Sequence, residues 1–201
     1  MKNSLIIILC FVAGVLLSYL GLLPAGSTES SLSFYILCGL IFLVGVSIGN
    51  NPDFIKDLKT INPRFYLLPL VTALGTLGAM ALVSLAGRHS LPENMAVGAG
   101  FGYYSLSSLF IGQYKGVWLG TLALLVNIFR ELITLMGAPW LKKWFGPLAP
   151  IAAGGATSMD TTLPVITRVS GQEFAVLSVF HGVVLDFSVP FLVTFFCSLD
   201  Y

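Results

Sequence analysis

The chain has 201 residues, of which 56% are hydrophobic and 9% are charged, with a formal net charge of +1. Soluble domains contain roughly 25% charged residues, so this composition indicates an integral membrane protein. The near balance of acidic and basic residues leaves no basic surface of the kind that binds nucleic acid.

The N-terminal part contains two apolar segments of spanning length. About 20 apolar residues cross the hydrocarbon core of a bilayer, and we predict spans at roughly residues 5–23 and 32–48. The first exceeds the roughly 7–15 apolar residues of a secretory signal, so we predict an uncleaved span. Lys2 precedes the first span and Lys56 and Lys59 follow the second, which favours a cytoplasmic N-terminus by the positive-inside rule.

Three further spans are predicted, at roughly residues 65–86, 117–136 and 175–196. Two other segments, residues 95–112 and 148–165, have nearly spanning length but are interrupted by Gly, Ser, Thr and Pro. Backbone groups at membrane depth must be hydrogen-bonded inside the protein, so irregular segments survive only where protein or a water-filled cavity surrounds them. The interruptions therefore favour broken or re-entrant hairpins.

The predicted fold class is an all-α integral membrane protein, with about five full transmembrane helices and two re-entrant glycine-rich hairpins. We expect a single polytopic transport domain over residues 1–201. Residues 99–108 can be laid on residues 153–162, because both open with Ala-Gly and close with two hydroxyl residues. Hairpins entering from opposite faces are typical of inverted-repeat transporters, whose site lies near the midplane.

Re-entrant hairpins also fix an orientation. They place Lys142, Lys143 and Arg168 on the cytoplasmic side, and both the re-entrant and the fully spanning model put the N-terminus inside and the C-terminus outside. If both segments crossed fully, the two lysines would lie outside, which fits the positive-inside rule slightly less well.

Glu131, in the fourth predicted span, is a candidate for substrate or proton binding. The helical repeat places it on one face with Asn127 and Thr134. A charge at the bilayer centre costs at least ~2.5 kcal/mol, so Glu131 must face the protein interior, pair, or take a proton. The alternative is a fixed salt bridge, with Arg130 or a lysine, that only holds helices together.

Asp160 lies in the second glycine-rich segment among hydroxyl residues. Its neighbours Ser158, Thr161 and Thr162 supply oxygen atoms that could solvate an ion or a substrate ammonium. The alternative is that Asp160 simply caps a helix beginning near Thr161. The first glycine-rich segment offers a matching set of hydroxyl groups, which we expect to line the opposite side of the site: Ser105, Ser107 and Ser108.

Asp186 and His181, in the last predicted span, form a possible proton path. Five residues apart, they are offset by about 140° around a helix and do not pair within it. Asp186 could instead pair with Arg130, and His181 could be neutral and hydrogen-bonded. The three cysteines lack metal-ligand spacing, and no nucleotide or hydrolase motif is present. We therefore expect no metal, no cofactor and no enzyme, and transport driven by an ion gradient.

Three blocks in this order resemble the LysO-type lysine exporter family. They are residues 100–108 (GFGYYSLSS), residues 127–131 (NIFRE) and residues 154–164 (GGATSMDTTLP). The resemblance implies export of L-lysine and its toxic analogues across a bacterial inner membrane, coupled to protons as an antiport. It also implies that intramembrane acidic residues are required. Glu131 matches one in its Asn-x-x-Arg-Glu context, and Asp160 lies in the most distinctive block.

The chain departs from this family at its N-terminus. Many members carry additional spans ahead of this region, with another membrane-embedded acidic residue. The resemblance therefore implies either a separately encoded small membrane subunit or a homo-oligomer. We expect alternating access, with the lysine carboxylate at a half-helix end and an ammonium near Glu131 or Asp160. Two alternatives remain open: another amino acid or organic ion coupled to Na⁺ or H⁺, and a non-catalytic subunit of a split transporter.

Overall fold

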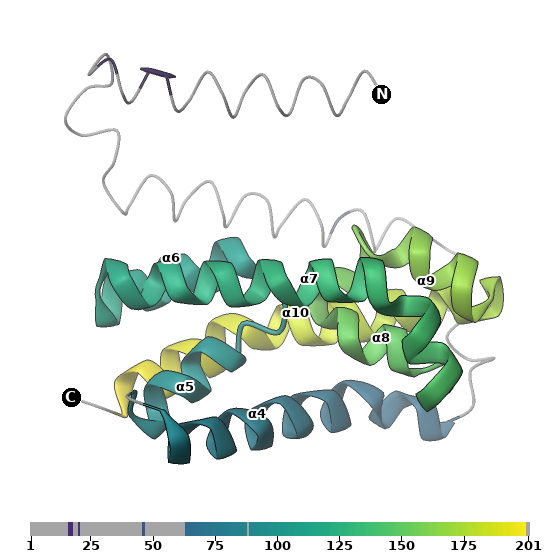
Figure 1. Cartoon of the computed structure of the whole chain (residues 1–201), viewed down its shortest axis with the longest axis horizontal. Coiled ribbons are helices and arrows are strands. Elements are labelled where there is room, and N and C mark those ends of the chain that lie inside the picture. Colours follow the sequence, from purple (N-terminus) through teal and green to yellow (C-terminus); the bar gives the residue numbers. More distant parts are fainter. Residues whose placement is uncertain (1–15, 18–19, 21–45, 47–62, 88, 200–201) are drawn as a thin grey trace. The chain divides into compact units, whose positions relative to one another are not determined.

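The computed structural model describes residues 63–87 and 89–199, together with positions 16, 17, 20 and 46 (Figure 1). The chain separates into two compact units, residues 1–49 and 50–201, and the fold described below is that of the second. The predicted spans at residues 5–23 and 32–48 fall almost wholly outside the described residues.

Three long helices form the frame of the second unit, and each is long and apolar enough to cross a membrane. All regular elements among the described residues are helices, which confirms the all-helical prediction and three of the five predicted spans. With their 3-10 extensions, the spans cover 23, 29 and 27 residues. The frame helices are α4 (Leu68–Ala86) after η1 (Pro63–Leu67), α7 (Val117–Phe145), and α10 (Ala175–Ser198) after η3 (Gln172–Phe174).

Helix α7 extends well beyond its predicted end at residue 136. It continues through Pro139 and ends at Phe145, with Lys142 and Lys143 in its last turn. Cations in this place interact favourably with the carbonyl end of the helix dipole. Trp140 and Trp144 are exposed on the same stretch, and tryptophans are enriched where a span leaves the hydrocarbon for the headgroups.

Two pairs of short helices connect the frame. In the first, α5 (Leu91–Gly98) runs from the end of α4 to the middle of the unit, and α6 (Tyr104–Lys115) returns to the same end (Figure 1). In the second, α8 (Ala149–Gly154) and η2 (Gly155–Met159) enter from the opposite end, and α9 (Leu163–Ser170) returns there. Even the 12 residues of α6 reach only about 18 Å, less than the ~30 Å hydrocarbon core.

Local sequence signals explain where the first pair begins. Ser90 caps α5 by accepting a hydrogen bond from the Glu93 amide at 3.3 Å, and the Glu93 carboxylate accepts from the Ser90 amide at 3.1 Å. This reciprocal arrangement satisfies two backbone donors at the helix start. Pro92 stands in the first turn, where its missing amide costs nothing.

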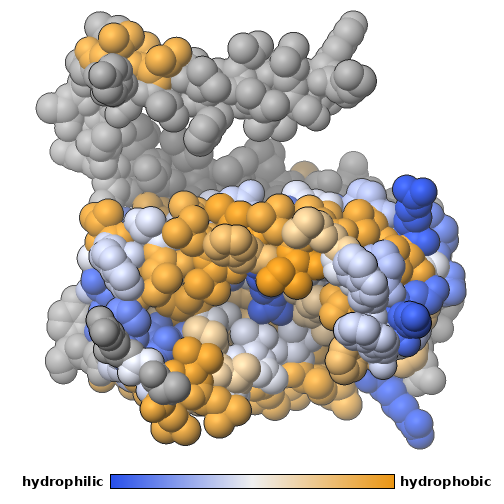
Figure 2. Space-filling model, in the orientation of Figure 1, coloured by the Kyte–Doolittle hydropathy of each residue, from blue (hydrophilic) through white to orange (hydrophobic). Residues whose placement is uncertain are grey.

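The surface of the second unit is apolar across its middle. Figure 2 shows a hydrophobic band on the visible face, with hydrophilic residues gathered at both ends and inside a hollow in the band. Exposed side chains such as Leu82, Ile133 and Phe187 belong to the three frame helices. A contiguous apolar surface of this kind is expected where lipid is the solvent.

Candidate functional site

The two hairpins meet tip to tip in the middle of the unit. The Ala156 amide donates to the Phe101 carbonyl at 2.8 Å, which joins the second tip to the first by main-chain atoms. A Cβ at Gly155 would overlap that same carbonyl oxygen, and the φ of Gly155 is 64°. Glycine is the residue that permits both the conformation and the close approach.

Asn127 of α7 holds the first tip. Its Oδ1 accepts from the Gly102 amide at 2.7 Å, and its Nδ2 donates to the Ala123 and Val97 carbonyls at 2.9 and 3.4 Å. The side chain is only 2% exposed. Asn127, predicted to bind substrate, therefore satisfies the backbone groups that the hairpin turn leaves open inside the protein.

The three predicted serines of the first hairpin occupy two different environments. Ser107 is fully buried and donates to the Tyr103 carbonyl at 2.8 Å, so it belongs to the same scaffold. Ser105 and Ser108 line a cavity of about 400 Å³ between α6 and α7, with Thr121 on the opposite wall. Glu131 lies ten residues further along α7 than Thr121, about 80° away around the helix.

Ser158 holds the second tip to α10 and, through His181, to α4. The Ser158 Oγ lies 2.7 Å from the Gly155 carbonyl, 2.9 Å from the Ser178 carbonyl and 3.0 Å from Nδ1 of His181. Nε2 of His181 lies 3.0 Å from the Thr72 hydroxyl. Because the serine has one proton for the carbonyls, we infer that Nδ1–H donates to Oγ and that Nε2 accepts from Thr72. A neutral His181 thus has both nitrogens satisfied.

Asn127 and His181 play corresponding parts in the two halves. Each comes from the frame helix that follows a hairpin and bonds to the tip of that hairpin. The same number of residues separates Asn127 from His181 as separates residue 99 from residue 153. The alignment of the two glycine-rich segments therefore extends to the side chains that hold them.

Asp160 lies at the exposed turn after the second tip. Helix α9 begins at Leu163, and its N-cap, Thr162, makes no side-chain capping bond. The Asp160 carboxylate accepts from the adjacent Thr161 amide, so it does not cap α9. Thr162 is buried and donates to the Thr157 carbonyl at 2.9 Å, whereas Thr161 is exposed beside Asp160.

Three carboxylates act electrostatically on the two tyrosines at the start of α6. Tyr103 interacts electrostatically with Asp186 and Asp160, and Tyr104 interacts with Glu131 and Asp160. Tyr103 lies in the hairpin turn outside the three candidate spans, where burial, then the Asp186 and Asp160 charges, raise its pKa to about 12. The described residues contain no group of three metal-ligating side chains, so these carboxylates do not converge on one ion.

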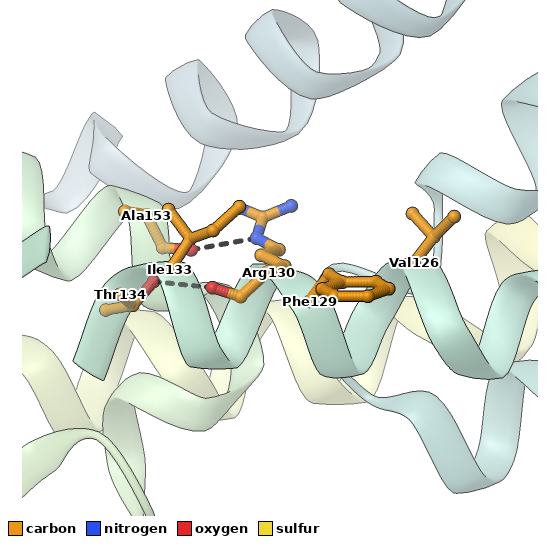
Figure 3. Close-up of a pocket in the computed structure, with 6 residues that line it drawn as sticks. All are labelled: Val126, Phe129, Arg130, Ile133, Thr134 and Ala153. Carbon is orange, nitrogen blue, oxygen red and sulfur yellow. Dashed lines mark hydrogen bonds between the residues drawn. The ribbon is translucent and has the colours of Figure 1, made fainter. Parts of the chain in front are cut away.

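Arg130 does not pair with a carboxylate among the described residues. Its Nε and Nη2 donate to the Ala153 and Ala152 carbonyls at 2.9 and 3.0 Å, and its Nη1 donates to the Thr76 hydroxyl at 3.3 Å. Figure 3 shows the bond to Ala153 beside an apolar cavity of about 460 Å³. The salt bridges considered for Arg130 with Glu131 or Asp186 are absent there, so both carboxylates stay available.

Comparison with known proteins places this chain in a family. The family model described as "Lysine exporter LysO" matches residues 8–197. The chain belongs to the LysO lysine exporter family. It is 33% identical over 172 residues to "Lysine exporter LysO" of Escherichia coli (strain K12), which covers 86% of this chain and 56% of that protein. The chain thus spans about half the length of this relative.

A second relative is closer in length to this chain. It is the "Putative lysine exporter" of Haemophilus influenzae, 29% identical over 166 residues, covering 83% of this chain and 84% of that protein. No solved structure matches the chain. The LysO family consists of multi-pass membrane exporters of bacteria, so family membership confirms the prediction that the chain is not an enzyme.

Sequence reasoning did not find the side-chain partners of His181 and Arg130 in this LysO chain. Thr72 contacts His181 and Thr76 contacts Arg130. The two threonines stand four residues apart in α4, so they share one helix face. Two hydroxyl residues on one face of an otherwise apolar span could have indicated that this face of α4 contacts polar groups inside the protein.

Proposed function

We propose that this chain forms a secondary transporter that exports L-lysine across the bacterial inner membrane in exchange for protons. The observation that carries the proposal is that three carboxylates act electrostatically on the tyrosines at the start of α6, Tyr103 and Tyr104: Glu131, Asp160 and Asp186. Among the described residues, Glu131 and Asp186 have neither a salt bridge nor a hydrogen bond. Intramembrane acidic residues mark substrate and proton paths, and separated carboxylates suit a substrate with two separated ammonium groups.

The hairpins act as the re-entrant halves of an inverted repeat. Short helices that enter from opposite ends and touch at mid-depth support this arrangement, and so does the correspondence of Asn127 with His181. A substrate bound at the tips contacts residues of both hairpins. A movement of one hairpin relative to the other then opens the site to one side of the membrane at a time.

The ends of the unit support an orientation. Arg64 precedes α4, Lys142 and Lys143 end α7, and Arg168 ends α9, all at one end of the unit (Figure 1). Lys115 ends α6 at the other. By the positive-inside rule the first end is cytoplasmic, which puts the C-terminus of α10 on the periplasmic side.

Substrate and proton compete for the same carboxylates in this mechanism. The lysine ammonium groups bind near Glu131 and Asp160, and the substrate carboxylate lies toward the amide groups at the start of α6, where the helix dipole favours an anion. A proton arriving from the periplasm neutralises one carboxylate and releases lysine outward. The cavity lined by Ser105, Ser108 and Thr121 is the approach along α6 and α7.

Uptake of labelled L-lysine into inside-out vesicles tests the proposal. An acid-inside gradient should drive uptake, and Glu131→Gln and Asp160→Asn should each abolish it while the protein still accumulates in the membrane. Expression of the chain alone and with a candidate small membrane subunit separates a self-sufficient exporter from one part of a split transporter. Full transport by both variants would refute the assignment of these carboxylates.

Na⁺ is the second candidate for the coupling ion, because Asp160 and the exposed Thr161 offer the oxygen ligands that hard cations prefer. Replacing Na⁺ by choline in the same vesicles distinguishes the two couplings. Competition by unlabelled arginine, ornithine and small organic anions tests the choice of substrate.

A further inference from the structure

Arg130 connects three helices through one planar group. Its Nε and Nη2 lie on one edge of the guanidinium and donate to the successive carbonyls of Ala153 and Ala152, while Nη1 donates to Thr76. The guanidinium therefore joins α7 to α8 and α4. A rigid fork with two parallel donors fits such a pair of acceptors, and a lysine ammonium does not reproduce that geometry.

The contact of Arg130 with α8 lies just before the second hairpin tip in the chain. The carbonyl groups in the last turn of an α-helix have no intrahelical partners, and Ala152 and Ala153 stand in the last turn of α8. A cation at this end satisfies them and interacts favourably with the helix dipole. Gly155 follows α8 directly, and a Cβ placed there would lie 3.2 Å from Cζ of Arg130. The guanidinium therefore packs against the backbone of the second tip.

We propose that Arg130 is the positioning residue of the transport site. By holding the end of α8, it sets the place of the second tip and of Asp160, which follows that tip. By directing its donors to carbonyl groups, it leaves the neighbouring Glu131 without an ion pair and open to the substrate ammonium. The second statement rests on the proposed function, whereas the first concerns the tip alone.

Two variants separate geometry from charge. Arg130→Lys keeps the charge and loses the fork, and Arg130→Gln loses the charge. Loss of a charge-assisted hydrogen bond corresponds to about a tenfold effect, so we expect both to raise the KM for lysine at least that much. We expect the maximal rate to change less, because the defect lies in substrate binding.

Lys142 provides the matched control. Its Nζ donates to the Val169 carbonyl at 2.6 Å and joins α7 to α9 at the end of the unit, far from the tips. Lys142→Gln therefore removes another contact between a cation and a carbonyl group, and should leave the KM unchanged. Equal KM values for both Arg130 variants and the wild type would overturn the proposal.

A second measurement follows the tip itself and does not depend on lysine transport. The reporter is Thr161→Cys in a chain whose own cysteines are replaced by alanine. Its rate of reaction with a membrane-impermeant maleimide measures how accessible the second tip is from the aqueous phase. Arg130→Lys and Arg130→Gln should change this rate severalfold, and Lys142→Gln should not. Thr76→Val removes only the Nη1 contact and should shift the rate less, which keeps the test decisive if the Arg130 variants do not accumulate.

The two measurements distinguish the possible failures. If the wild type moves no lysine but the labelling rate responds to Arg130, the proposed function fails and the positioning role stands. If lysine is transported and neither KM nor labelling responds, Arg130 has no positioning role.

Discussion

A single methyl group at Gly155 should separate the two hairpins. In Gly155→Ala the new Cβ would overlap the Phe101 carbonyl oxygen, at a backbone conformation that L-residues rarely adopt. Such backbone strain costs about 1–3 kcal/mol, and loss of the hydrogen bond from Ala156 to Phe101 adds about 0.5–1.5 kcal/mol. The expected total is a destabilisation of the tip junction by about 1.5–4.5 kcal/mol.

Gly78→Ala is the control, because a Cβ at Gly78 on α4 meets nothing within 4 Å. Alanine in a helix interior is favoured over glycine by roughly 0.5–1 kcal/mol, so this variant should be as stable as the wild type or slightly more so. Both are compared by thermal unfolding in detergent and by lysine uptake into inside-out vesicles. Wild-type uptake and an unchanged unfolding midpoint in Gly155→Ala would refute the tip-to-tip contact.

Three further substitutions probe the groups around the tips. Asn127→Ala leaves the buried Gly102 amide without an acceptor, at about 1–3 kcal/mol, and should lower the unfolding midpoint in detergent. His181→Gln should keep the pH profile of lysine uptake, because the hydrogen bonds of His181 suit a neutral ring; a shifted profile would assign it a proton. Burial and the charges of Asp186 and Asp160 raise the pKa of Tyr103 to about 12, so its phenol does not titrate near neutral pH and Tyr103→Phe should not shift the pH dependence of uptake.

Hydropathy predicts the frame of this protein better than its ends. The three described spans were found because a run of apolar residues is a direct signature of a lipid-facing helix. The last turns of α7 were missed, since Pro139 and the lysines that follow it read as a break. The helix nevertheless continues to Phe145. Tryptophan and lysine side chains are favourable at the level of the lipid headgroups, so a helix can extend beyond the hydrocarbon with these residues.

The polar residues of the hairpins show why site prediction from sequence has a limit. Asn127, Ser107 and Ser158 stand out in an apolar sequence and look like ligands. A chain that reverses inside a protein must satisfy the main-chain groups it buries there, and these three side chains do so. The partners of Arg130 have no side-chain signature at all, because they are carbonyl groups of Ala152 and Ala153.

The length of α7 ties the tips to the thickness of the bilayer. Its 29 residues measure about 43 Å, against a hydrocarbon core of ~30 Å. The excess lies in the segment with Trp140 and Trp144, whose rings anchor at the interface. A thicker membrane draws this anchor outward, and α8, which starts just beyond it, carries the second tip along. Transport should therefore vary with acyl-chain length in reconstituted vesicles and be fastest where the hydrocarbon thickness matches the distance from the tryptophans to the tip junction.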